Sequence, residues 1–166
     1  MSFMVNWYKK YFAIFLLFLC SVTGHAGCLK VNDLKVKPSV RFRLESQAKE
    51  KVFFWLAENL PTEIKKIGLV DRTLEKNADE HLYVSRLSKK FKGQTFYAGG
   101  YSSIPDAGKG VIVIGIDFLC WQAEKNILVG GSKKYRSGGG YFYRFVLSEV
   151  KGELLVSEAV AQGIGD

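Results

Sequence analysis

Two periods of hydrophobic and polar positions follow one another along this chain. In the first half, apolar residues recur at helical spacing, and the members of this stripe are Ala48, Val52, Trp55, Leu56 and Leu60. The stripe predicts a helix that starts after Ser46, which would serve as its N-cap, and that ends before Pro61. Thr62–Ile67 is expected to form a second, short helix. The segment Val40–Leu44 alternates, which fits either a short strand or the first turns of the same helix.

From residue 80 onward the pattern is typical of β-strands. The expected strands are 82–87, 94–98, 110–120, a strand that starts at 127–129, 141–147 and 154–160. The segment 110–120 is the most apolar part of the chain after residue 26, so we expect a central strand that is buried on both faces. Lys151-Gly152 separates the last two strands and predicts a hairpin turn.

The distribution of glycine divides the chain in the same way, into a helix-like first half and a strand-like second half. Gly68 is the only glycine between residues 29 and 92, whereas glycines are frequent from Gly93 onward. Because glycine is poor in helices and common at turns, we predict an α+β fold with N-terminal helices packed on a C-terminal antiparallel sheet. The order of a helix first and a long closing hairpin resembles the cone-shaped cystatin-like and nuclear-transport-factor-like folds. This is an analogy of architecture, and it implies no function.

The first 26 residues have the pattern of a cleaved signal peptide. A basic pair, Lys9-Lys10, precedes the apolar run 11–22, and small residues stand at the positions that a signal peptidase reads. We therefore expect a periplasmic or secreted protein that is cut after Ala26, and one globular domain over 27–166. Two alternatives stay open. The leader could remain as a membrane anchor, although its apolar run is shorter than the roughly 20 residues of a span, or a lipid could be attached at Cys28.

Export decides how the cysteines are interpreted. Cys20 lies in the leader, so the domain retains Cys28 and Cys120. Oxidising compartments favour disulfides, and we expect these two cysteines to be joined. The alternative is a pair of unrelated buried thiols. A catalytic thiol is not expected, because His81 is the only histidine after the leader and nothing marks it as a base.

The chain is basic, and its charge is unevenly placed. The net charge is +8, and most of the excess of Lys and Arg falls in residues 29–92, whereas residues 93–166 are balanced. A basic face could contact an acidic protein, a glycan or a lipid headgroup, although a plain solvated surface is the simpler interpretation. Export disfavours nucleic acid as a partner, and membrane contact is expected only through an uncleaved leader.

A glycine-flanked segment in the last third of the chain is the candidate contact loop. We expect its residues to form the exposed tip of a hairpin and to bind a protein partner; they are Lys133, Lys134, Tyr135 and Arg136. Tyr101, on a second glycine-flanked loop, is a further candidate contact. The segment 130–140 lacks the spacing of a phosphate-binding loop, so a hairpin is favoured over a nucleotide site.

Candidate chemistry elsewhere is sparse. Asp117 lies in a very apolar segment and is expected to have a structural partner among the Lys and Arg residues. His81, beside Asp79 and Glu80, has too few companions for a metal site, which needs three or four ligands, so we expect an ordinary surface or half-buried histidine. The sequence therefore predicts no catalytic residue, no metal and no cofactor.

The pattern as a whole favours a binding protein over an enzyme. Export, a cysteine pair, a basic face and glycine-flanked loops predict a small exported protein of the inhibitor or immunity type, which blocks a protein partner. The alternative is a structural or accessory component of an envelope assembly, such as a secretion or conjugation apparatus. An enzyme whose site is assembled from scattered residues ranks third.

Overall fold

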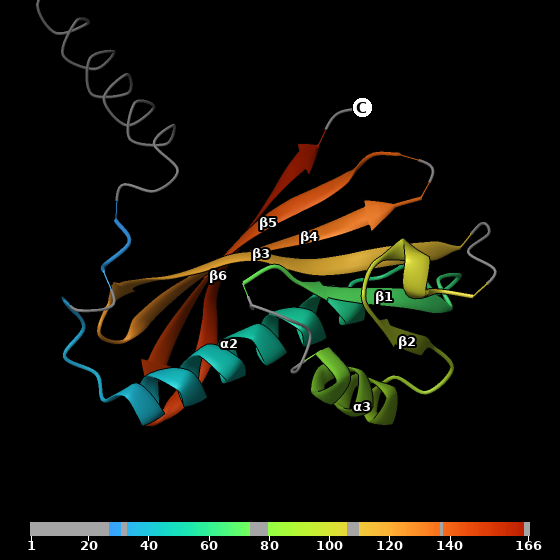
Figure 1. Cartoon of the computed structure of the whole chain (residues 1–166). Helices are drawn as coiled ribbons and strands as arrows, with labels where there is room; N and C mark the ends of the chain where they lie inside the picture. Colours follow the sequence, from blue (N-terminus) through green and yellow to red (C-terminus); the bar gives the residue numbers. More distant parts are fainter. Residues whose placement is uncertain (1–26, 31–32, 74–79, 106–109, 137, 165–166) are drawn as a thin grey trace, which may run out of the picture.

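The fold is one layer of helices against one face of a mixed β-sheet (Figure 1). A computed structural model describes residues 27–30, 33–73, 80–105, 110–136 and 138–164. Within these ranges the elements are α2 (Pro38–Glu58), β1 (Lys66–Asp71), α3 (Glu80–Lys90), β2 (Thr95–Ala98), the 3₁₀ turn η2 (Tyr101–Ser103), β3 (Val111–Ala123), β4 (Asn126–Tyr135), β5 (Gly140–Val150) and β6 (Glu153–Ile164). The α+β class that the sequence predicts is confirmed.

The helix α2 crosses the sheet and buries one side along most of its length. Proline occupies the start of the helix, where its missing N–H costs nothing. The buried side chains recur three or four residues apart; they are Leu44, Ala48, Val52, Phe53, Leu56 and Ala57. Val40 also packs against this core. The helix therefore begins at Pro38 and not after Ser46, and Val40–Leu44 forms its first turns.

The six strands lie in the order β2-β1-β3-β4-β5-β6. β1 pairs in parallel with both β2 and β3, whereas β3 to β6 form an antiparallel meander. The expectation of an antiparallel sheet is thus correct for β3 to β6 and wrong for the other edge. There, β1, α3 and β2 form a parallel strand–helix–strand unit.

Two expected elements are wrong. Residues 82–87 lie in the helix α3 and not in a strand, and residues 66–67, expected to end a short helix, begin β1. In α3 the buried residues Glu80, Tyr83 and Leu87 have helical spacing, and basic residues follow in the last turn. The weak alternation of this segment concealed that stripe. In β1 the apolar residues Ile67 and Leu69 face the helices in the core.

Consecutive glycines in β4 allow tight packing on both faces of the sheet. A Cβ atom on Gly130 would collide with the ring of Phe118, which covers that position. A Cβ on Gly131 would lie 3.0 Å from Phe145 and 3.2 Å from Val52, so α2 approaches β4 closely here. The segment that the sequence assigns to a hairpin thus begins as a central strand. The turn lies farther along, where Gly138 and Gly139 have positive φ.

The start of the described chain is fixed to the sheet. Cys28 and Cys120 lie within disulfide distance, with Cα atoms 5.4 Å apart, and the backbone N–H of Leu29 donates to the carbonyl of Trp121 at 2.7 Å. The predicted pairing is therefore compatible with the fold. No helix in the described ranges is long and apolar enough to cross a membrane.

We predict that non-reducing peptide mapping of the exported protein will show Cys28 linked to Cys120. A bridge across so many residues restricts the unfolded chain, so replacing both cysteines by serine should lower the free energy of unfolding by about 2–5 kcal/mol. Denaturant unfolding with and without reductant measures this difference. Two free thiols in protein from an oxidising compartment would contradict the prediction.

Candidate functional site

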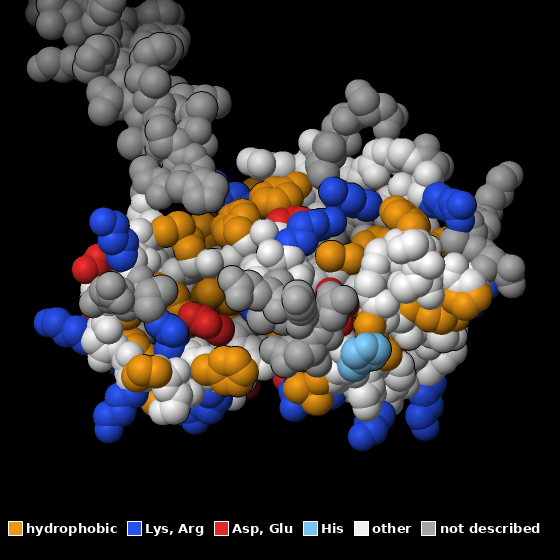
Figure 2. Space-filling model, viewed as in Figure 1, with side chains coloured by type: hydrophobic (Ala, Val, Ile, Leu, Met, Phe, Trp, Pro, Cys, Tyr) orange, Lys and Arg blue, Asp and Glu red, His pale blue; other side chains and the backbone are white. Residues whose placement is uncertain are grey.

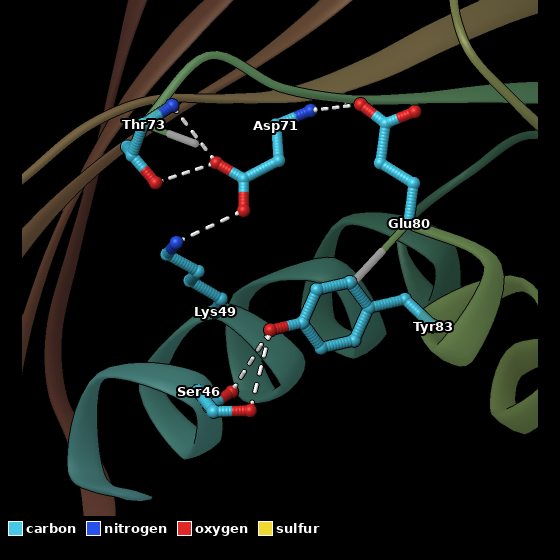
Figure 3. A network of polar contacts seen from close by, with 6 residues as sticks. All are labelled: Ser46, Lys49, Asp71, Thr73, Glu80 and Tyr83. Carbon is cyan, nitrogen blue, oxygen red and sulfur yellow. Dashed lines mark hydrogen bonds and ion pairs between the residues drawn. The ribbon is translucent and has the colours of Figure 1, made fainter. Parts of the chain in front are cut away.

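A buried polar network joins β1 to both helices (Figure 3). The Lys49 Nζ atom of α2 lies 3.0 Å from Oδ2 of Asp71, at the end of β1, and both side chains are buried. Oδ1 of Asp71 accepts hydrogen bonds from the backbone N–H and the hydroxyl of Thr73. The carboxylate of Glu80, at the start of α3, accepts the backbone N–H of Asp71 at 2.8 Å.

These polar groups are directed at one another and at the backbone. Tyr83 of α3 adds a longer contact across to α2, where its hydroxyl lies 3.4 Å from Oγ of Ser46. A buried charge is tolerated when it is paired, and Lys49 and Asp71 form such a pair, with Oδ1 of Asp71 also hydrogen-bonded to Thr73. The network therefore orients β1, α2 and α3, and we assign it a structural role.

Lys49→Met should destabilise the fold by about 3–5 kcal/mol, because it leaves the Asp71 carboxylate buried without its cation. The double variant Lys49→Met with Asp71→Asn should recover part of this loss. Urea unfolding measures the free energy of unfolding of the single and the double variant. The matched control is Lys51→Met on the same helix, whose partner Glu153 is exposed, and this change should cost no more than about 1 kcal/mol. Equal effects of Lys49→Met and Lys51→Met would contradict the structural role.

The first residue of the expected contact loop is buried. Lys133 is only 3% exposed, on the face of β4 that meets α2. Its Nζ atom donates to the carbonyl of Asn59, the residue that caps α2, at 2.7 Å. The ammonium also lies 5.5 Å from the ring centre of Trp55 and 5.2 Å from that of Tyr143. The expectation that Lys133 is an exposed contact is therefore wrong, because strand alternation turns it inward.

Burial lowers the pKa of Lys133 to about 8, whereas the ordinary value of 10.5 applies in the unfolded chain. Between these values the unfolded state binds more protons, so the free energy of unfolding rises with pH. We predict that the stability of the wild type relative to Lys133→Met increases between about pH 7.5 and pH 10. Urea unfolding of both proteins across this range measures the difference. A difference that does not change with pH would contradict the lowered pKa.

The other residues of the expected contact loop have mixed positions. Lys134 and Arg136 are exposed, whereas Tyr135 is half-buried and packs against the core. The hydroxyl of Tyr101, in η2, donates to the backbone carbonyl of Lys134. Burial raises the pKa of this tyrosine. The structure thus brings Tyr101 onto the end of β4. Only Lys134 and Arg136 of the expected contact loop are exposed, so its accessible surface is smaller than the sequence suggests. The role of the loop in binding stays a prediction.

The remaining sequence candidates have ordinary environments. Asp117, at an irregularity in β3, forms an ion pair with Arg72, so the expected structural partner is confirmed. His81 is exposed on α3, as expected. Among the described residues, no group of three or more His, Cys, Asp or Glu side chains could hold a metal ion. Asp79 lies outside the described ranges.

Sequence reasoning missed a groove between α2 and the beginning of β6. The groove has a volume of about 590 Å³, and its lining is Gln47, Glu50, Lys51, Phe54, Trp55 and Glu58 of α2, Lys90 of α3, and residues 152–156. The half-buried rings of Phe54 and Trp55 give it an apolar surface. Ion pairs join the elements around it: Lys51 reaches Glu153 at 3.2 Å, and Lys90 pairs with Glu58.

The strand beside this groove has an outer edge that no other described strand pairs with. Among the described residues, β6 is the last strand of the sheet and its pairing partner is β5. Its C-terminal end points away from the helices in Figure 1. Leu155 and Val160 are 45% and 42% exposed, and residues 157–163 are all exposed. Proteins usually protect such an edge with charges or bulges, and β6 has a bulge near Ser157, but residues 159–163 carry no charge.

No protein-family model, no curated protein and no solved structure matches this chain. The analogy to cystatin-like and nuclear-transport-factor-like folds therefore gains no support from a known relative.

Proposed function

We propose that this chain is an exported binding protein that engages and blocks a protein partner, as inhibitors and immunity proteins do. The observation that carries the proposal is the exposed outer edge of β6, whose first residues line the apolar groove. A partner that contributes an extended segment can pair its backbone with this edge, which is a common mode of peptide recognition. The analogy with inhibitors rests on this binding mode together with the signal-peptide pattern of the leader.

The groove supplies the specificity that backbone pairing lacks. Alternate side chains of an added strand would face the α2 side, where Phe54, Trp55 and Val156 leave apolar surface uncovered. The ion pair between Lys51 and Glu153 lies at this boundary and offers polar contacts to the added segment. We propose that the partner segment is extended and has apolar residues at every second position.

The export that this function requires is supported by two features. The leader has the pattern of a signal peptide, and the retained cysteines lie at disulfide distance in the fold. We therefore propose a periplasmic or secreted location for the mature domain. The binding role is proposed as non-enzymatic, because the buried polar cluster described above directs its charged groups at one another and at the backbone.

Charge on the β6 edge should abolish partner capture. The test variant is Val160→Lys with Ala161→Lys, two exposed positions on opposite faces of the strand, so the fold should be retained. The wild-type and variant proteins are immobilised and used to capture partners from the envelope of the source cells. We expect one stoichiometric protein with the wild type and at least a tenfold reduction with the variant.

The matched control is Gln122→Lys with Ala123→Lys, which adds the same charges at exposed positions at the end of β3, next to the turn to β4. This control should capture the partner as the wild type does. Capture that survives the β6 substitutions would refute the edge as the binding site. Recovery of many components of one apparatus would favour an accessory role in an envelope assembly over inhibition.

A further inference from the structure

A second surface feature lies at the opposite end of α2 from the Lys90–Glu58 ion pair. Five cations gather where the described chain begins and where α2 starts; they are Lys30, Lys35, Lys37, Arg41 and Arg43. We call this set the N-terminal basic patch. All except Arg41 are exposed. Figure 2 shows Lys and Arg side chains over this end of the molecule, on the left. Phe42 lies within the set and is 64% exposed, the largest exposure among the large hydrophobic residues described.

Two hydrogen bonds and an ion pair place the two parts of the patch side by side. The backbone of Leu29, next to Lys30, is hydrogen-bonded to Trp121. The indole N–H of Trp121 donates to Glu45 at 2.8 Å, and Glu45 in turn lies 3.7 Å from Nε of Arg41. The segment that leaves the leader and the first turns of α2 therefore share one end of the domain.

The charge of this patch is not neutralised within the described part of the chain. There, Arg41 has Glu45 as an ion-pair partner, whereas Lys30, Lys35, Lys37 and Arg43 have no carboxylate within ion-pair distance. The cations gather around the start of α2, which is the positive end of the helix dipole. The first turn of α2 contains no acidic residue that would offset this positive charge. Both effects raise the electrostatic energy of the patch and favour contact with an anionic surface.

The sequence that precedes the patch indicates which anionic surface this is. The apolar run of the leader ends at residue 22, only six residues before Cys28. Even a fully extended connection would span no more than about 20 Å. As long as the leader is attached and inserted, the basic patch and Phe42 therefore remain close to a bilayer surface. An exposed aromatic ring among cations is also the composition of interfacial membrane contacts.

We infer that the N-terminal basic patch docks on anionic phospholipid headgroups, with Phe42 inserted at the interface. This inference is independent of the β6 edge, which lies on another part of the domain and stays available to a protein partner. It extends membrane contact beyond the leader to the folded domain itself. Lipid headgroups suit this patch because they accept cations from a loop and a helix without requiring one fixed geometry.

Co-sedimentation with lipid vesicles tests the inference. The chain exported through its own leader is mixed with vesicles of phosphatidylglycerol and phosphatidylcholine in equal parts, or of phosphatidylcholine alone. We expect binding to the anionic vesicles only, and weaker binding at high salt. Lys35→Gln with Lys37→Gln should reduce partitioning about thirtyfold, at the usual contribution of a cation near an anionic surface. Phe42→Ser should reduce it by about tenfold or more, because the ring no longer leaves water.

A matched control lies at the far end of α2. Lys89→Gln with Lys92→Gln removes the same charge from exposed positions around the end of α3, and Leu82→Ser removes an exposed apolar side chain of that helix. These variants should bind like the wild type, and circular dichroism verifies that all variants are folded. Because every variant is exported through the same leader sequence, cleaved or uncleaved, any effect of the leader is the same in all of them.

Several outcomes would overturn the inference. Equal losses from the patch and the control variants would show that net charge alone is responsible. Equal binding to neutral vesicles would assign the interaction to the leader or to apolar contact. If the wild type ignores anionic vesicles but binds poly-L-glutamate, the patch recognises an acidic polypeptide and not a membrane.

Discussion

The close contact between α2 and β4 at Gly131 is the constraint on which the arrangement of this domain depends. A Cβ atom there would lie 3.0 Å from Phe145 and 3.2 Å from Val52 of the helix, so these side chains would have to move by a few tenths of an ångström to admit it. Because the helix lies so near the sheet, Trp55 packs against the edges of aromatic rings on β5, with centroids 5.1 Å apart for Phe145. The same approach encloses Lys133, whose ammonium is satisfied by the end of the helix.

A helix fixed in this way covers only part of a long, twisted sheet. The first residues of β6 lie beside α2, whereas its C-terminal half is exposed and extends past the helix layer (Figure 1). The buried pair of Lys49 and Asp71 holds β1 against α2. The C-terminal half of β6 therefore projects from a domain whose other strands and helices are packed together. An edge that is already formed as a strand presents its backbone groups to a partner in the conformation that pairing needs, which reduces the entropic cost of binding.

Charge is organised differently in the two ends of the domain. Around the groove, ion pairs join α2 to α3 and to β6, so the local charges largely cancel. At the beginning of α2 the cations other than Arg41 have no carboxylate within ion-pair distance in the described chain. Self-repulsion of this kind is unfavourable in the isolated domain and becomes favourable beside an anionic surface. The two ends therefore differ in charge, which agrees with our proposals of a polypeptide partner at β6 and a lipid surface at the N-terminal basic patch.

The sequence by itself determined the elements whose local pattern has one interpretation. The apolar segment that became β3, the hairpin turn at Lys151-Gly152, the core stripe of α2 and the cysteine pair could all be predicted, because period and turn chemistry suffice for them. Tertiary structure decided the rest. Residues 82–87 have too few apolar positions to separate a helix from a strand, and packing on β1 and β2 selects the helix. Lys133 is a charged residue in a glycine-rich segment, and only the position of the α2 terminus and two aromatic rings makes its burial favourable. The groove beside β6 joins residues from α2, α3 and β6, so no local pattern could have shown it, because a surface formed by distant segments exists only once they have packed.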